Sequence, residues 1–144
     1  MKKLLLVVLA AVLFLGITGC GGANTKSVKI SLGASERFSD KELQAAVDCV
    51  LGRFRKWDIG VTVKAIYYDE AESIRLAASY IDQPQYDIYG EHPNDIIVLF
   101  SDFHTPDGAQ AGGFNPNANY NGWSWYLIRD GKGSPWREYS HGYA

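Results

Sequence analysis

Four asparagines and two tryptophans lie close together in the stretch Asn115–Trp125, NPNANYNGWSW. Asparagine closes Asx-turns and tolerates left-handed backbone conformations, so the stretch predicts a structured loop that leads into a strand. The same residue types also form small-ligand sites, in which flat rings pack against the ligand and amides hydrogen-bond to it. In that alternative the ligand-binding residues are Asn119, Asn121, Trp123, Trp125 and Trp136.

Asp102 and His104 form a second group of residues that can do chemistry. They are two positions apart in an extended segment, so we expect them on one face of a strand. Such a pair can act as a base with its orienting carboxylate, or it can ligate a metal. The alternative is a polar strand end that leads into a loop.

No catalytic or cofactor motif accompanies these groups. The chain lacks the GxSxG, Walker and dinucleotide-binding patterns, and it lacks the HxxxH, HExxH and CxxC spacings. The asparagine stretch also lacks the carboxylates and the sixth-position glycine of an EF-hand loop. We therefore predict no metal and no cofactor, and we assign no catalytic residue. His92 is expected in a solvated turn and His141 in a loose C-terminal tail.

Residues 1–19 have the features of a signal peptide. Lys2 and Lys3 precede an apolar run of about a dozen residues, which is shorter than the roughly 20 that a bilayer span needs. Ile17–Cys20, with the sequence ITGC, then resembles the bacterial lipobox. The resemblance implies that cleavage precedes Cys20 and that this cysteine is acylated. Because two or more acyl chains anchor a protein stably, we expect the chain on the extracytoplasmic face of the cell membrane.

The rest of the chain has the length of one ordinary domain. Residues 20–34 are expected to form the lipidated N-terminus and a flexible tether, and residues 35–144 a single domain. The formal net charge of −2 becomes more negative when the two signal-peptide lysines are removed. An acidic chain without a basic cluster argues against a nucleic-acid partner. Cys49 would be the one remaining cysteine, which excludes an internal disulfide and favours a half-buried thiol.

The clearest predicted element is a helix that begins near Ser39. The segment SDKE at 39–42 is a capping box, and Phe38 with Leu43 makes a hydrophobic staple. Apolar residues recur at helical spacing from there to Trp57. They are expected in the core, although the last aromatic residues of this stripe can also line a cavity.

The remaining pattern alternates strands with one more helix. Residues 28–32, 61–68, 95–100, 123–129 and 135–139 are predicted strands, the first a short edge strand. Residues 69–72 would cap a second helix that buries Ile74, Ala77, Ala78 and Ile81. The main order α-β-α-β-β-β predicts an α+β domain with two helices packed on a curved antiparallel sheet.

Several of these segments together carry a family resemblance. They are FSDKELQAAVDCVLGRF, IYYDE, NDIIVLFSDF and NGWSWYLIRDGKGSPWREYSHGY, in addition to the lipobox. The chain resembles a group of small Gram-positive lipoproteins of unknown function. Its final segment is similar to the closing hairpin of cystatin-like, nuclear transport factor two-like domains. The resemblance implies a location and a fold but supplies no catalytic residues.

Three functions remain open at this point. The first is a non-enzymatic domain, tethered to the membrane, that binds a small ligand or an envelope protein near Trp123, Trp125 and Trp136. The second is a cavity enzyme of hydrolase or isomerase type that uses Asp102 and His104. The third is a structural envelope protein whose aromatic residues are all core.

Overall fold

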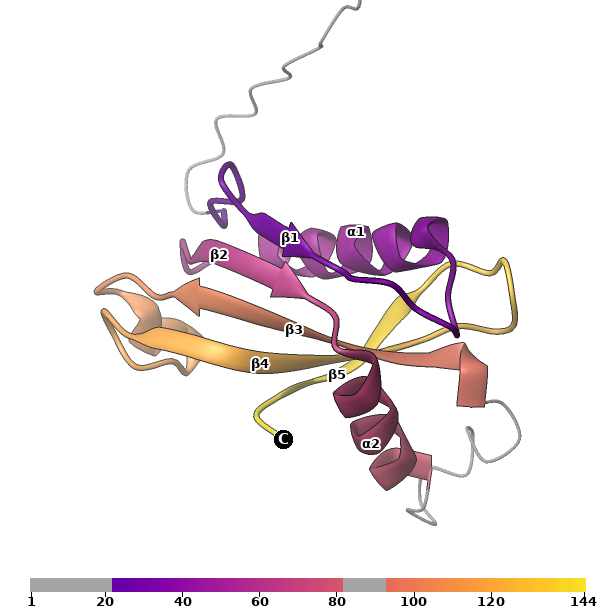
Figure 1. The fold of residues 1–144 in the computed structure, drawn as a ribbon. Helices are drawn as coiled ribbons and strands as arrows, with labels where there is room; N and C mark the ends of the chain where they lie inside the picture. Colours follow the sequence, from indigo (N-terminus) through magenta and orange to yellow (C-terminus); the bar gives the residue numbers. More distant parts are fainter. Residues whose placement is uncertain (1–21, 82–92) are drawn as a thin grey trace, which may run out of the picture.

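The computed structural model describes residues 22–81 and 93–144 (Figure 1). The predicted signal peptide, Cys20 and His92 lie outside these residues. In the described part of the chain, no helix has the length and apolar character needed to cross a membrane.

A five-stranded mixed sheet forms the centre of the domain, in the order β1-β2-β3-β4-β5. Its strands are β1 (Lys29–Ser31), β2 (Thr62–Tyr67), β3 (Ile96–His104), β4 (Asn119–Ile128) and β5 (Arg137–Gly142). The helices are α1 (Asp40–Lys56) and α2 (Glu70–Ile81). The predicted α+β class with two helices is therefore confirmed.

The first strand lies at the edge of the sheet, as predicted, but its direction of pairing differs from the prediction. β1 pairs with β2 in parallel, whereas the other neighbours in the sheet pair antiparallel. A crossover through α1 joins β1 to β2, and such a crossover lets neighbouring strands run parallel. The predicted order α-β-α-β-β-β is not matched, because the structure begins with β1, and the sheet is mixed rather than antiparallel. β1 also lies inside residues 20–34, so part of the segment expected as a tether belongs to the sheet.

Helix α1 begins as the sequence predicts. The Ser39 hydroxyl accepts a hydrogen bond from the Glu42 amide, and the Glu42 carboxylate accepts one from the Ser39 amide. These contacts satisfy two backbone donors that a helix start otherwise leaves unpaired. The helix ends at Trp57, whose extended backbone and amide bond to the Phe54 carbonyl cap its last turn.

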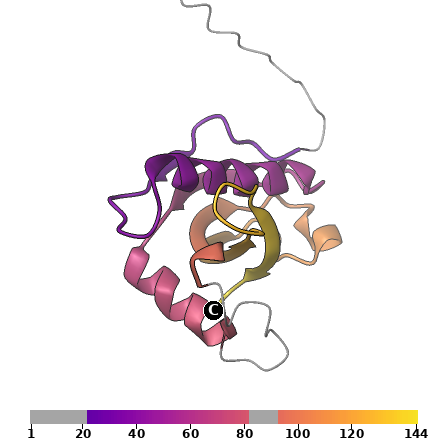
Figure 2. The same cartoon turned by 90° about the vertical axis from the view of Figure 1, so that its right-hand side faces the viewer.

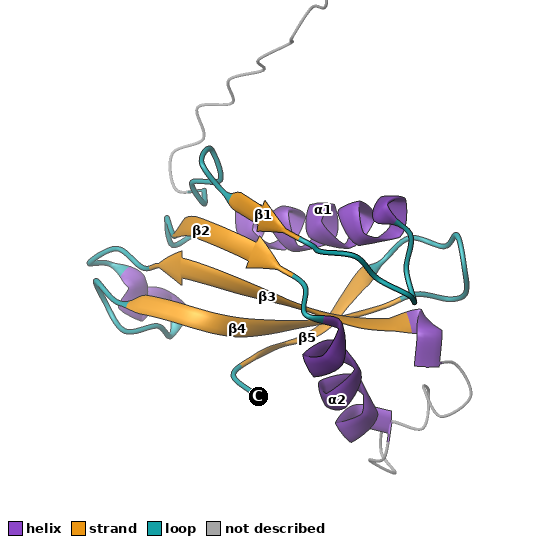
Figure 3. Ribbon diagram, in the orientation of Figure 1, coloured by secondary structure: helices purple, strands orange, loops and turns teal. Residues whose placement is uncertain are grey.

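The two helices cover opposite faces of the sheet (Figures 1 and 2). One core cluster joins α1 to residues such as Val63, Leu99 and Leu127, and the second joins α2 to residues such as Val98 and Ile128. Figure 3 shows β3 passing between the two helices. Ile96–Phe100 are all buried, which confirms the prediction of a central strand with both faces covered.

The buried face of α2 was predicted only in part. Ala77 is buried as expected, but Ser73 and Leu76 are also buried, whereas Ile74 is 45% exposed and Ala78 is exposed. The Ser73 hydroxyl accepts a hydrogen bond from the Val98 amide at 3.0 Å. A polar contact with β3 therefore helps to set the rotation of this helix, and apolar spacing does not reveal it.

One irregularity near the end of the sheet, a bulge in β4, decides which residues share a face. Ser101 pairs with Trp123 and Phe103 with Tyr120, so β4 carries one extra residue between these pairs. Gly122, with φ of 69°, adopts the left-handed backbone that this bulge uses. The bulge places Tyr120 and Trp123 together on the α1 face.

The last strand also extends further toward the C-terminus than the predicted end at residue 139. β5 continues to Gly142, and His141 pairs with Trp125. The prediction of a loose tail at His141 is therefore wrong, because the backbone of β4 offers it a partner strand.

Candidate functional site

A hollow with aromatic walls opens where β4 begins and β5 ends. We call it the aromatic hollow, and it has a volume of about 450 Å³. Its lining residues are Trp57, Asp58, Ile59, Gly112, Gly113, Phe114, Tyr120, Trp123 and His141. They come from the end of α1, from the loop after β3, and from strands β4 and β5.

The loop between β3 and β4 fits closely against the end of α1. A 3-10 turn, η3 (Ala109–Gly112), places Gly112 so that a Cβ atom there would lie 2.6 Å from Ile59 Cγ2. Gly113 follows with φ of 83°. Glycine is required at both positions, at the first for space and at the second for backbone conformation. This close fit places Phe114 in the wall of the aromatic hollow.

The aromatic walls form one connected set of ring contacts. The Phe114 ring centroid lies 5.1 Å from that of Trp57, 5.3 Å from Tyr120 and 5.6 Å from Trp123. Tyr120 in turn stacks on the buried Phe103, with ring planes only 3° apart. Offset and edge contacts of this kind hold rings in fixed positions. The rings of the wall therefore pack against one another. Each of the four, Trp57, Phe114, Tyr120 and Trp123, nevertheless stays partly exposed.

The aromatic hollow contains polar groups that have no hydrogen-bond or ion-pair partner among the described residues. Trp123 Nε1 is buried and has no hydrogen-bond partner within the described part of the chain. Asp58 is exposed, and no hydrogen bond or ion pair of its carboxylate occurs among residues 22–81 and 93–144. An unpaired buried donor costs about 1–3 kcal/mol, so Trp123 carries a cost that a bound acceptor would offset.

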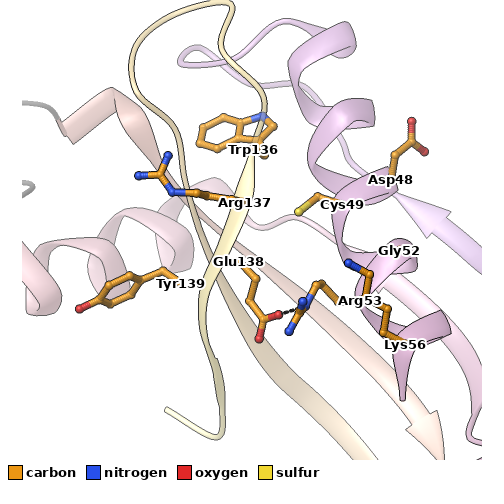
Figure 4. Close-up of a pocket in the computed structure, with 9 residues that line it drawn as sticks. All are labelled: Asp48, Cys49, Gly52, Arg53, Lys56, Trp136, Arg137, Glu138 and Tyr139. Carbon is orange, nitrogen blue, oxygen red and sulfur yellow. Dashed lines mark ion pairs between the residues drawn. The ribbon is translucent and has the colours of Figure 1, made fainter. Parts of the chain in front are cut away.

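His141 is held by a carboxylate on its own strand. Its Nδ1 bonds to Glu138 Oε1, and Arg53 of α1 forms an ion pair with the other oxygen of Glu138. Figure 4 shows Glu138 pointing from β5 toward Arg53. A carboxylate accepts only, so Nδ1 carries a proton, which in the neutral ring leaves the Nε2 lone pair available. The histidine is therefore oriented at the edge of the aromatic hollow.

Only one of the three predicted ligand-binding tryptophans lines the aromatic hollow. Trp125 is fully buried, and its indole N–H donates to Ser101 Oγ at 2.8 Å. Trp136 lies near the start of α1, where its N–H donates to the Glu42 carbonyl at 3.1 Å. Trp123 remains, with its N–H unpaired.

The predicted asparagines lie away from the aromatic hollow. Asn119 pairs with His104 across the strands and accepts hydrogen bonds from Lys64 Nζ at 2.7 Å and His104 Nδ1 at 3.0 Å. This is the α2 face, because His104 alternates with Phe100 along β3. Asn121 is exposed beside the bulge. Simple alternation would have grouped both asparagines with Trp123, and the bulge removes Asn119 from that group.

Asp102 and His104 share a strand face, but each bonds to other groups. The Asp102 carboxylate accepts from the Gly122 amide at 2.9 Å and from the Tyr67 hydroxyl at 3.4 Å. His104 Nε2 lies 3.1 Å from Asn117 Oδ1. Both partners of an orienting pair are thus occupied elsewhere. In the described segments, no three His, Cys, Asp or Glu side chains lie close enough to hold a metal.

A second groove runs between α1 and β5 and has Cys49 in its wall (Figure 4). Its charged groups pair largely with one another or with close neighbours, since Arg53 binds Glu138 and Arg137 binds Asp130 at 2.9 Å. Burial, and next the charge of Glu138, raise the pKa of the Cys49 thiol. The thiol is therefore a poor nucleophile at neutral pH.

Sequence reasoning missed several residues of the aromatic hollow. It counted Trp57 as core with the option of lining a cavity, and it gave no role to Phe114, Tyr120 or Glu138. His141 was set aside as part of a tail. Residues 137–142, REYSHG, do not alternate between apolar and polar types, so the sequence carries no signal that would have placed His141 on a strand.

No protein-family model matches the chain, and neither a curated protein nor a solved structure shows significant similarity to it.

Proposed function

We propose that this chain is a lipoprotein, anchored through Cys20 on the extracytoplasmic face of the cell membrane, whose domain binds a ligand in the aromatic hollow without transforming it. The binding role is supported mainly by Trp123 Nε1, which is buried and has no hydrogen-bond partner among the described residues. This atom belongs to a concave wall of packed, partly exposed aromatic rings. Natural cores rarely leave such a donor unpaired, and exceptions call for an explanation. A ligand acceptor supplies one.

The alternative of a cavity enzyme that uses Asp102 and His104 has less support. Asp102 and His104 lie on the α2 face and bond to Gly122, Tyr67, Asn117 and Asn119 rather than to each other. A base needs an orienting partner and a reachable substrate. The alternative of a purely structural role would require the rings of the aromatic hollow to be fully packed, whereas they line an open volume of about 450 Å³.

The lipobox resemblance supports the anchored location. The test is to grow cells that express the full chain with an alkyne-tagged fatty acid and to measure label on the purified protein. We expect label on the native chain and on Cys49→Ala, and none on Cys20→Ala. Equal labelling of Cys20→Ala would exclude the proposed anchor.

Intrinsic fluorescence tests the binding role, using the full chain in detergent micelles. A panel of sugars, peptidoglycan fragments, lipid headgroups and amines is titrated while emission is recorded. A saturable change that Trp123→Ala abolishes and Arg137→Ala leaves intact would support the aromatic hollow as the site. Circular dichroism confirms that both variants fold. Saturable binding that survives in Trp123→Ala would place the site elsewhere.

A further inference from the structure

We infer that the aromatic hollow takes an organic cation, of the alkylated ammonium class. The inference rests on the proposed binding function and specifies its ligand. It follows from the charge, the ring surfaces and the sparse hydrogen-bonding groups of the lining.

The formal charge of the lining is negative. Among the described residues that line the aromatic hollow, Asp58 is the one carboxylate, and neither Lys nor Arg is present. Asp58 also has no ion pair or hydrogen bond of its side chain within the described segments, so its charge is available to a ligand. The groove beside Cys49 differs, because Arg53, Lys56 and Arg137 line it. An anionic ligand would thus be disfavoured in the aromatic hollow and a cation favoured.

The ring surfaces add to this preference. Trp57, Phe114, Tyr120 and Trp123 contribute four aromatic rings to one concave wall. The face of an aromatic ring carries negative electrostatic potential, and tryptophan attracts cations most strongly. Clusters of such rings beside a carboxylate are suited to ammonium groups that carry methyl substituents, because the methyl groups pack on the rings while the charge is attracted to them.

The lining provides few groups for a neutral sugar. Recognition of several hydroxyls needs several donors and acceptors in fixed positions. The amide of Asn119, which was the expected source, is bonded on the α2 face, and Asn121 does not line the aromatic hollow. The lining side chains that can hydrogen-bond are Trp57, Asp58, Tyr120, Trp123 and His141. The Tyr120 oxygen already accepts from the Asn115 amide at 2.9 Å.

His141 fits a cationic ligand when its ring is neutral. Glu138 accepts from Nδ1, so the Nε2 lone pair can accept a hydrogen bond from a ligand. An ammonium that retains one N–H would use this acceptor. A hydroxyl on the ligand would accept from Trp123 Nε1 if a small side-chain movement exposed that buried atom. Choline carries both a trimethylammonium group and a hydroxyl, which makes it a suitable probe.

The test compares choline with its uncharged carbon isostere, 3,3-dimethylbutan-1-ol. Binding of both to the full chain in detergent micelles is measured by tryptophan fluorescence, with tetramethylammonium and N-acetylglucosamine as further probes. We expect choline to bind at least about tenfold more tightly than the isostere, a difference of about 1.4 kcal/mol. The shapes match, so the charge is responsible for the difference.

Two variants locate the effect. Asp58→Asn should weaken choline binding several-fold and leave the isostere unchanged, because it removes charge and keeps shape. Asp48→Asn is the matched control, since Asp48 is an exposed carboxylate of α1 that lines the other groove. It should leave both probes unchanged, and thermal unfolding should show both variants folded.

Each other outcome has a definite meaning. Equal affinity for choline and the isostere, or no effect of Asp58→Asn, would overturn the cation inference. Saturable binding of N-acetylglucosamine alone, lost in Trp123→Ala, would overturn it while the binding function stands. Failure of these probes, together with the wider panel, to bind would remove both proposals.

Discussion

The two ends of the interface between α1 and the sheet differ in whether their polar groups are paired. At the start of α1, the Arg129 side chain is only 4% exposed, and its guanidinium donates to Glu42 at 2.7 Å, Asp95 at 3.0 Å and the Asn94 carbonyl at 3.1 Å. Its Cζ atom lies 4.5 Å from the Trp136 ring centroid. At the other end of α1, the aromatic hollow leaves Trp123 Nε1 and Asp58 without partners in the described structure.

This difference separates a stabilising cluster from a binding surface. We call the first the Arg129 cluster, made of Arg129, Glu42, Asp95, Phe38 and Trp136. A buried charge is tolerated only when it is paired and hydrogen-bonded, and the Arg129 cluster meets that condition. Both regions contain aromatic rings, two in the Arg129 cluster and four in the wall of the aromatic hollow, but the hollow lacks this internal pairing. Aromatic residues alone therefore do not identify a site, whereas their unpaired polar neighbours help to do so.

The largest expected effect comes from removing the centre of the Arg129 cluster. Arg129→Met leaves Glu42 and Asp95 without their buried cation, so the free energy of unfolding should fall by about 3–5 kcal/mol. Urea denaturation followed by circular dichroism measures this. Ligand binding in the aromatic hollow should persist wherever the variant is folded. A loss below about 1 kcal/mol would show that the cluster is not the stabilising end.

A smaller effect, with a defined pH dependence, is expected at Glu42. Hydrogen bonds from the Ser39 amide and from Arg129 lower the pKa of Glu42 to about 2. The folded state therefore holds its proton less tightly than the unfolded chain, in which a glutamate has a pKa of about 4.3. The resulting stability is complete above the unfolded pKa and is lost as the pH falls toward 2.

The variant Glu42→Gln tests the direction of this pH dependence of stability. At pH 7 it should reduce the free energy of unfolding by about 2 kcal/mol, because it loses the charged contact with Arg129 and weakens the capping box. The difference from the native chain should shrink as the pH is lowered from 5 to 3. A difference that grows on acidification would contradict the assignment.

In the aromatic hollow, removing a polar group should not lower the free energy of unfolding, in contrast to the Arg129 cluster. Trp123→Phe keeps a ring but removes the buried unpaired donor, so stability should stay level or rise by up to about 1 kcal/mol. Ligand affinity should fall, since phenylalanine presents a smaller ring and no donor. Chemical denaturation and fluorescence titration on the same samples measure both quantities. Destabilisation by more than about 2 kcal/mol would place Trp123 with the core instead.

The smallest change is expected at Cys49, between the two ends. Because burial and Glu138 raise the pKa of its thiol, alkylation by iodoacetamide at neutral pH should be slower than in the unfolded chain. The Cys20→Ala background leaves this thiol as the only one. Glu138→Gln should speed the reaction, since it removes a negative charge near the thiol. An unchanged rate in Glu138→Gln would mean that burial alone protects it.

Features that depend on neighbours along the chain can be predicted from the sequence alone. The capping box at Ser39 and Glu42 is satisfied within three residues, and the stripe of α1 repeats within each turn. The apolar run at Ile96–Phe100 is buried on both sides of the sheet and therefore carries its own signal. Such local contacts leave a readable pattern because the spacing of residues fixes which of them meet.

The composition of the aromatic hollow depends instead on contacts between segments that are distant in the sequence. The bulge at Gly122 moves Tyr120 to the tryptophan face and leaves Asn119 on the other, and one added residue reverses every later side chain. β1 pairs with β2 across the whole of α1, and His141 joins the sheet because β4 offers it an edge. These choices depend on backbone hydrogen bonds between distant segments, which carry no signal in side-chain order.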